Sequence, residues 1–165
     1  MTIASEVERL DTGDSEGCKY RGGHREVLTP TQTDLIPYIL KVEESGALCL
    51  SGSAEGAAWT LPSAEAGLWY EFGATVSVTS TEVYSVTTAS GDFIKGVIVG
   101  GNLTADSSGD VFTGDGSTHV TITSNGGTTG GLIGDSFVLT AISDTIWVVT
   151  QGVNVGSGTN ATPFA

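Results

Sequence analysis

The sequence predicts an all-β protein, a compact sandwich or small barrel of about eight short strands with an extended N-terminal arm and a short polar C-terminal tail. The composition supports this class, because 24 Gly accompany only 4 Pro and 1 Met, with abundant Thr, Val and Ser. β-Branched residues suit pleated surfaces, and Gly suits tight turns. Alternation of apolar and polar residues is the second observation, and closely spaced turn signals are the third.

The expected strands lie between these turn signals. Within one of them, Leu68, Tyr70 and Phe72 share one face, while Trp69 and Glu71 point to the other. We expect the first face to lie in the core and the second to meet solvent or a partner. The predicted strands are 47–50, 57–61, 68–78, 83–88, 94–99, 120–123, 136–142 and 145–149.

The chain is long enough for one hydrophobic core with extensions, at 165 residues. Its first residues mix charge and Gly with few large apolar side chains, which favours a flexible arm. Pro30 and Pro37 then argue against a helix and against a central strand. We divide the chain into an N-terminal arm (1–27), an extended connector or edge strand (28–41), a β-domain (42–152) and a C-terminal tail (153–165).

The net charge argues against two classes of partner. At −13 the protein repels a phosphate backbone, so we expect no nucleic acid partner. No apolar run reaches the about 18 residues of a membrane span, so we expect no membrane partner. Four of the six basic residues lie before position 26, within the arm.

The chain has little that resembles catalytic machinery, and we predict that it is not an enzyme and has no cofactor. Of its two histidines, His24 lies in the arm with Cys18, where nothing rigid holds the pair in reacting geometry. His119 is interpreted as an ordinary surface residue. A carboxylate-based hydrolase or lyase remains an alternative, with acids drawn from Glu65, Glu71, Asp92 and Asp135.

Two binding alternatives stay open from the residues alone. Asp106, Asp110 and Asp115 in a Gly-rich region have the chemistry for Ca²⁺, although a solvated turn explains them as well. Exposed aromatic residues, including the tryptophans, are typical of a sugar platform, although alternation places at least two of them in the core. The tryptophans are Trp59, Trp69 and Trp147.

Three segments resemble a pattern of small virion proteins of tailed phages, especially from aquatic environments. The first is ESGALCL at 44–50 followed by WTLPSAEAGLWYEF at 59–72, and the second is VTTASGDFIKG at 86–96. The third is GDSFVL at 134–139, followed by Trp147. Their order and spacing agree with the pattern across residues 44 to 155.

The resemblance implies a capsid decoration, or cement, protein that binds the outer surface of the assembled shell and stabilises capsomer junctions. It further implies the major capsid protein as partner, a homotrimer, and a place on the virion exterior after synthesis in the host bacterial cytoplasm. The alternative is a receptor-binding or fibre-tip module for a bacterial glycan. Our candidates for partner contacts are Ile3, Val7, Arg9, Leu10, Lys19, Arg21, Arg25, Leu28, Leu35, Ile36 and Tyr38.

Overall fold

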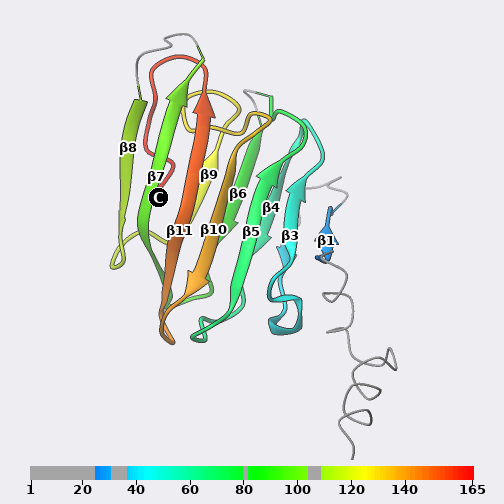
Figure 1. The fold of residues 1–165 in the computed structure, drawn as a ribbon, viewed down its shortest axis with the longest axis vertical. Coiled ribbons are helices and arrows are strands. Elements are labelled where there is room, and N and C mark those ends of the chain that lie inside the picture. The colour runs from blue at the N-terminus through cyan, green and yellow to red at the C-terminus, as the bar shows by residue number, and fades with distance from the viewer. Residues whose placement is uncertain (1–24, 31–36, 80–81, 104–108) are drawn as a thin grey trace, which may run out of the picture.

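The predicted all-β fold is confirmed by the computed structural model, which describes residues 25–30, 37–79, 82–103 and 109–165. These residues form 11 strands in two facing sheets and contain no α-helix (Figure 1). The sheets do not close on each other, so the architecture is a sandwich rather than a barrel.

The large sheet has seven strands and the small sheet has four. In spatial order the large sheet contains β1 (Val27–Leu28), β3 (Leu48–Ser51), β5 (Trp69–Ala74), β10 (Ser136–Ala141), β11 (Ile146–Gly156), β7 (Phe93–Asn102) and β8 (Gly109–Asp115). The small sheet contains β2 (Tyr38–Ile39), β4 (Gly56–Thr60), β6 (Val83–Thr87) and β9 (Thr121–Ser124). A short 3₁₀ turn, η2 (Val42–Glu44), lies between β2 and β3.

The first half of the chain coils between the two sheets. Strands β1 to β6 alternate between the large and the small sheet, and neighbours within each sheet run parallel. A parallel pair needs a crossover connection, which here is the strand of the opposite sheet. Of the strands that the structure describes, only β7 with β8 and β10 with β11 form antiparallel pairs of consecutive strands.

Each of the eight predicted strands overlaps an observed one, while β1, β2 and β8 were not among them. The strand predicted at 68–78 ends earlier, at Ala74, and the one predicted at 145–149 continues to Gly156. Strand β8 has Gly and Asp at both ends, residues that are depleted in strands, so its sequence resembles a turn.

The core lies between the sheets and is rich in aromatic residues. Tyr70 and Phe72 are buried, whereas Trp69 and Glu71 of the same strand are half-buried on the outer face, as the alternation predicted. Phe72 stacks on Phe137 at 5.2 Å between ring centroids, and Trp59 meets Phe72 edge-on at 6.1 Å. The largest fully buried side chains are Trp59, Trp147, Tyr70, Phe72, Phe137, Leu40, Leu61, Ile94, Ile98, Ile122, Leu139 and Val86.

The expected C-terminal tail at 153–165 requires correction, because these residues belong to the fold. Strand β11 runs to Gly156, and the end of the chain pairs along β9. The Thr123 N–H donates to the Pro163 carbonyl at 2.8 Å, and Phe164 is buried. The segment is mostly polar, so its composition did not predict that it is part of the fold. One aromatic side chain and a few backbone hydrogen bonds hold it in place.

The connector expected at 28–41 contains the edge strand β2 and the second residue of the edge strand β1, which begins at Val27 within the expected arm; each strand is two residues long. Pro30 has no N–H with which to extend β1, and Pro37 directly precedes β2. Leu40 is 1% exposed, so the core begins before the boundary expected at residue 42.

Candidate interaction surface

The described structure includes three of the predicted partner-contact residues, and all three lie where the two sheets begin. We call this region the N-terminal edge: Arg25 to Leu28, β2 and Lys41 to Glu44. The remaining candidates, which lie outside the described residues, are Ile3, Val7, Arg9, Leu10, Lys19, Arg21, Leu35 and Ile36.

Arg25 fastens the start of the described chain to the outer face of the large sheet. Its Nη1 donates to Glu71 Oε2 in a half-buried ion pair. Its guanidinium also lies 5.7 Å from the ring centroid of Trp69, within cation–π range. The Leu48 N–H donates to the Glu26 carbonyl at 2.8 Å, which adds a backbone link to β3. We call Arg25, Trp69 and Glu71 the Arg25 clamp.

Replacing Arg25 with Ala should lower the free energy of unfolding by about 1 kcal/mol, because it removes the ion pair and the cation–π contact. It should also speed hydrogen exchange at the Leu48 amide, which is bonded to Glu26. Arg25→Lys is the matched control, since it keeps the charge but lacks the planar group, and we expect an intermediate effect. Unchanged exchange at Leu48 in Arg25→Ala would contradict an anchoring role.

Leu28 and Tyr38 are also engaged within the chain. Leu28 packs against the core, and Tyr38 meets Trp59 edge-on at 5.4 Å. The Tyr38 hydroxyl donates to Glu44 Oε1 at 2.6 Å. This hydrogen bond, with burial and nearby carboxylates, raises the pKa of Tyr38 to about 12. Both side chains therefore stabilise the N-terminal edge.

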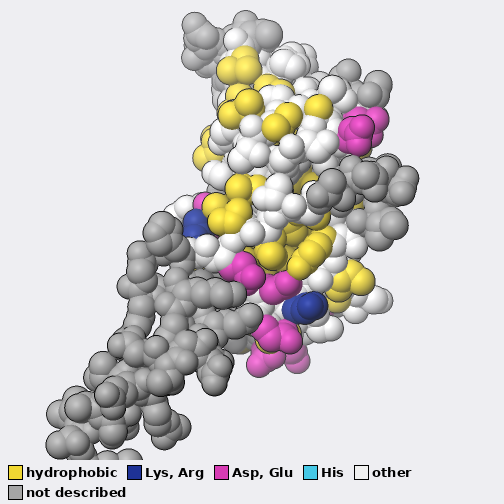
Figure 2. Space-filling view, turned by 90° about the vertical axis from the view of Figure 1, so that its right-hand side faces the viewer, with side chains coloured by type: hydrophobic (Ala, Val, Ile, Leu, Met, Phe, Trp, Pro, Cys, Tyr) yellow, Lys and Arg dark blue, Asp and Glu magenta, His cyan; other side chains and the backbone are white. Residues whose placement is uncertain are grey.

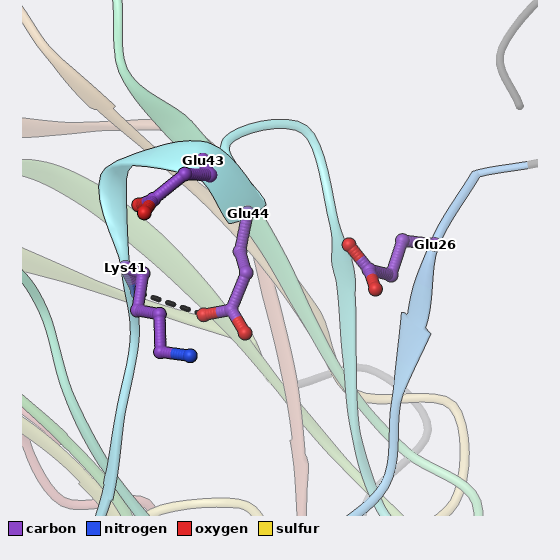
Figure 3. Close-up of a pocket in the computed structure, with 4 residues that line it drawn as sticks. All are labelled: Glu26, Lys41, Glu43 and Glu44. Atoms are coloured by element: carbon purple, nitrogen blue, oxygen red, sulfur yellow. Dashed lines mark hydrogen bonds between the residues drawn. The ribbon is translucent and has the colours of Figure 1, made fainter. Parts of the chain in front are cut away.

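A small pocket at this edge is lined by Glu26, Lys41, Glu43 and Glu44 (Figure 3). Glu44 lies between Lys41 and Glu26 in this view, and its Oε2 accepts the Lys41 backbone N–H at 2.7 Å. Three Glu and one Lys line the pocket, so its lining is acidic. Across the described residues, no group of three or more His, Cys, Asp or Glu side chains is arranged to hold a metal ion.

The surface around the pocket combines apolar and acidic side chains. Figure 2 shows hydrophobic side chains gathered across this side of the molecule, with acidic side chains grouped below them. Val27, Ile39 and Val42 are large apolar residues of the N-terminal edge that remain 48–68% exposed. Sequence reasoning did not select Val27, Ile39 or Val42, because single exposed apolar residues carry no signal in the sequence.

The two Gly-Asp pairs of the resembling segments are structural. Asp92 is buried, and its Oδ2 accepts the Ala64 N–H at 2.8 Å. Asp135 is 6% exposed, and it accepts the N–H groups of Gly131 and Val155, the latter at 2.6 Å. Burial raises the pKa of Asp135 to about 6, although the backbone hydrogen bonds oppose this shift. Each carboxylate thus ties a loop to the sandwich.

Asp110 and Asp115 are too far apart to ligate one Ca²⁺ ion. They lie near opposite ends of β8, five residues apart, or about 16 Å in an extended strand. Asp115 Oδ1 accepts the Ser117 and Thr118 N–H groups at 2.8 and 2.9 Å. Hydrogen bonds from Thr118 and Ser117 hold the pKa of Asp115 well below its usual range. Asp106 lies outside the described residues.

The aromatic residues considered for a sugar platform are not assembled into one. Trp59 and Trp147 are buried in the core, and the ring of Trp69 lies beneath Arg25. His119 is half-buried against Phe164, and its Nδ1 lies 3.1 Å from Asp115 Oδ1. His24 and Cys18 lie outside the described residues.

No family model, curated protein or solved structure matches the chain. Among the described residues there is no helix with the length and apolar character needed to cross a membrane.

Proposed function

We propose that the protein is a non-enzymatic capsid decoration protein of a tailed bacteriophage, which binds the outer surface of the assembled shell and stabilises capsomer junctions. The observation that carries this proposal is the set of three segments that resemble phage virion proteins. Their most characteristic residues occupy positions that define the sandwich. Tyr70, Phe72 and Trp147 lie in the core, and Asp92 and Asp135 tie loops to it.

The distribution of charge supports the same role. A decoration protein must remain soluble at high local concentration on the shell, and a net charge of −13 favours that. Three of the six basic residues, Arg9, Lys19 and Arg21, lie in residues 1–24, and they are the proposed contacts with an acidic capsid surface. The major capsid protein is therefore the proposed partner, and the virion exterior the proposed location.

The N-terminal edge is the proposed base from which residues 1–24 reach the shell. The Arg25 clamp and the β1–β3 pairing fix the point where this segment leaves the sandwich. Segments outside a folded domain often order on a partner by adding a strand to one of its edges. A homotrimer, the proposed oligomer, requires a heterologous contact between copies.

Deleting residues 1–24 should abolish co-sedimentation with assembled shells of the phage that encodes the chain. The deletion stops at residue 24, and not at the end of the expected arm at residue 27, because Arg25 belongs to the clamp and Val27 belongs to β1. Circular dichroism and urea unfolding should show that the shortened chain still folds. The control is a full-length chain with Arg9, Lys19 and Arg21 changed to Gln, which should bind more weakly and lose its salt dependence. Undiminished binding by the deletion variant would refute the proposed contact.

A further inference from the structure

The four outer edges of the two sheets differ in how they are protected. An unpaired strand edge is a template for another strand, and proteins shield such edges by short strands, Pro, charges or cover. Strands β1 and β2 are two residues long and adjoin Pro30 and Pro37. The edge of β9 is covered by the end of the chain, since Thr121 and Ala165 exchange two backbone hydrogen bonds of 2.9 Å.

Strand β8 is the exception among the edges of the described structure. It is seven residues long, contains neither Lys nor Pro, and lies at the edge of the large sheet with no strand on its far side (Figure 1). Its two charges, Asp110 and Asp115, lie toward the ends. A long edge without protection in its middle is a site for strand addition.

The hydrogen-bond pattern identifies which backbone groups are open. The Gly116 N–H donates to the Ile94 carbonyl at 2.9 Å, next to the Lys95–Asp115 pair. Backbone direction alternates along a strand, so Phe112 and Gly114 point to β7. Val111 and Thr113 therefore direct their N–H and C=O groups away from β7, toward the open side. The outward Asp115 N–H is bonded to His119 Nδ1 at 3.2 Å, which agrees with this alternation.

A row of exposed valines leads to the same edge. Val153, Val99 and Val111 are direct neighbours on β11, β7 and β8, and they are 49%, 47% and 67% exposed on the outer face. Val97 follows on β7 beside Thr113. The outer face next to the open edge is thus apolar.

We propose that the β8 edge binds the β8 edge of a second copy, as an antiparallel pair about a twofold axis at Phe112. In this register Val111 is opposite the partner's Thr113, which gives four backbone hydrogen bonds. Each Asp110 is opposite a Gly114, and each Asp115 is opposite a Gly109, so no two carboxylates are opposed. Phe112, which packs against the core, meets its own copy across the axis.

The expected contact is a reversible dimer. One pair of seven-residue strands makes a smaller interface than the about 1,200–2,000 Å² of stable complexes. Two chains of net charge −13 also repel each other, so added salt should strengthen the dimer by screening. This proposal does not rest on the capsid role, and the isologous β8 contact is separate from the heterologous contacts of the proposed homotrimer.

The test is sedimentation velocity of the full chain over a range of concentrations, at low and high salt. Thr113→Pro removes an outward N–H without touching the β7–β8 bonds, and should weaken the dimer more than about tenfold. Thr113→Ala, which keeps that N–H, should leave the dissociation constant of the dimer unchanged. Circular dichroism checks that each variant folds.

A second pair of variants tests the register and does not depend on how Thr113→Pro folds. Among the described residues, the Cβ of a residue at Gly109 would meet only the Gly100 carbonyl, at 3.5 Å, so we expect larger residues to fit there. Gly109→Lys places an ammonium opposite the partner's Asp115, whereas Gly109→Asp places a carboxylate there. We expect the dissociation constants of the two dimers to differ by about tenfold, with the Gly109→Lys dimer binding more tightly. A monomer under all conditions, or an oligomer that neither pair of variants changes, would overturn the proposal.

Discussion

Replacing Gly56 with Ala is expected to lower the free energy of unfolding by about 4 kcal/mol. Gly56 has φ of +83°, and a Cβ there would lie 2.0 Å from the Val83 carbonyl oxygen. That oxygen belongs to the backbone of the neighbouring strand β6, so no side-chain movement can relieve the clash. The parallel pairing of β4 with β6 must shift, and urea unfolding measures the loss.

Gly67→Ala is the matched control for this substitution. Gly67 has φ of +103°, but in the described part of the chain no atom beyond its two neighbours in sequence lies within 4 Å of its added Cβ. Only the backbone strain remains, about 1 kcal/mol for a residue with a side chain in this conformation. Equal losses from the two substitutions would show that close approach of β4 and β6 does not constrain Gly56.

Replacing Asp135 with Ala is expected to cost about 3 kcal/mol, because buried N–H groups of Gly131 and Val155 lose their acceptor. A Cβ at Gly130 would lie 2.5 Å from Asp135 Oδ2 and 2.8 Å from Asn154 Cγ. Gly130 and Asn154 therefore pack closely around the carboxylate that this substitution removes. Leu139→Ala, which only opens a cavity, should cost a similar amount but should not change the dependence of stability on pH.

Asp135 also predicts how stability depends on pH. Its pKa is about 6 in the folded chain, above the ordinary value of 3.8, so the folded state binds the proton more tightly. This tighter proton binding contributes to the free energy of unfolding. The contribution is fully present below pH 3.8 and is lost as the pH rises through about 6. When the pH is lowered from 7 to 4, the free energy of unfolding of the unchanged protein should rise by on the order of 2 kcal/mol relative to that of Asp135→Asn. Parallel pH profiles for the two proteins would contradict the raised pKa.

Side-chain alternation and turn residues were sufficient to predict most strands and the core face of β5. They could not predict the coiling of β1 to β6, because a Gly-rich turn looks the same whether the chain forms a hairpin or crosses to the other sheet. Strand β8 was missed for a related reason. Its Asp110 and Asp115 suggested a solvated turn or a Ca²⁺ loop, whereas the pairing with β7 that makes it a strand is a long-range property.

The contacts that the candidate residues make within the chain could be predicted only in part. Arg25, Leu28 and Tyr38 were chosen for partner contacts, yet their described interactions lie within the chain. The partners Glu71 and Glu44 could not be chosen in advance, since they depend on which strands become neighbours. The charge separation between the arm and the domain was visible at once, because it needs only the order of residues.

The most direct test of the proposed function is a reconstruction of the virion in which the sandwich can be placed. We expect copies on the outer surface of the shell at capsomer junctions, in a number that scales with that of the major capsid protein. Residues 1–24 should make the contacts with the shell. A few copies confined to the tail or its fibres, or none on the particle, would contradict a decoration protein.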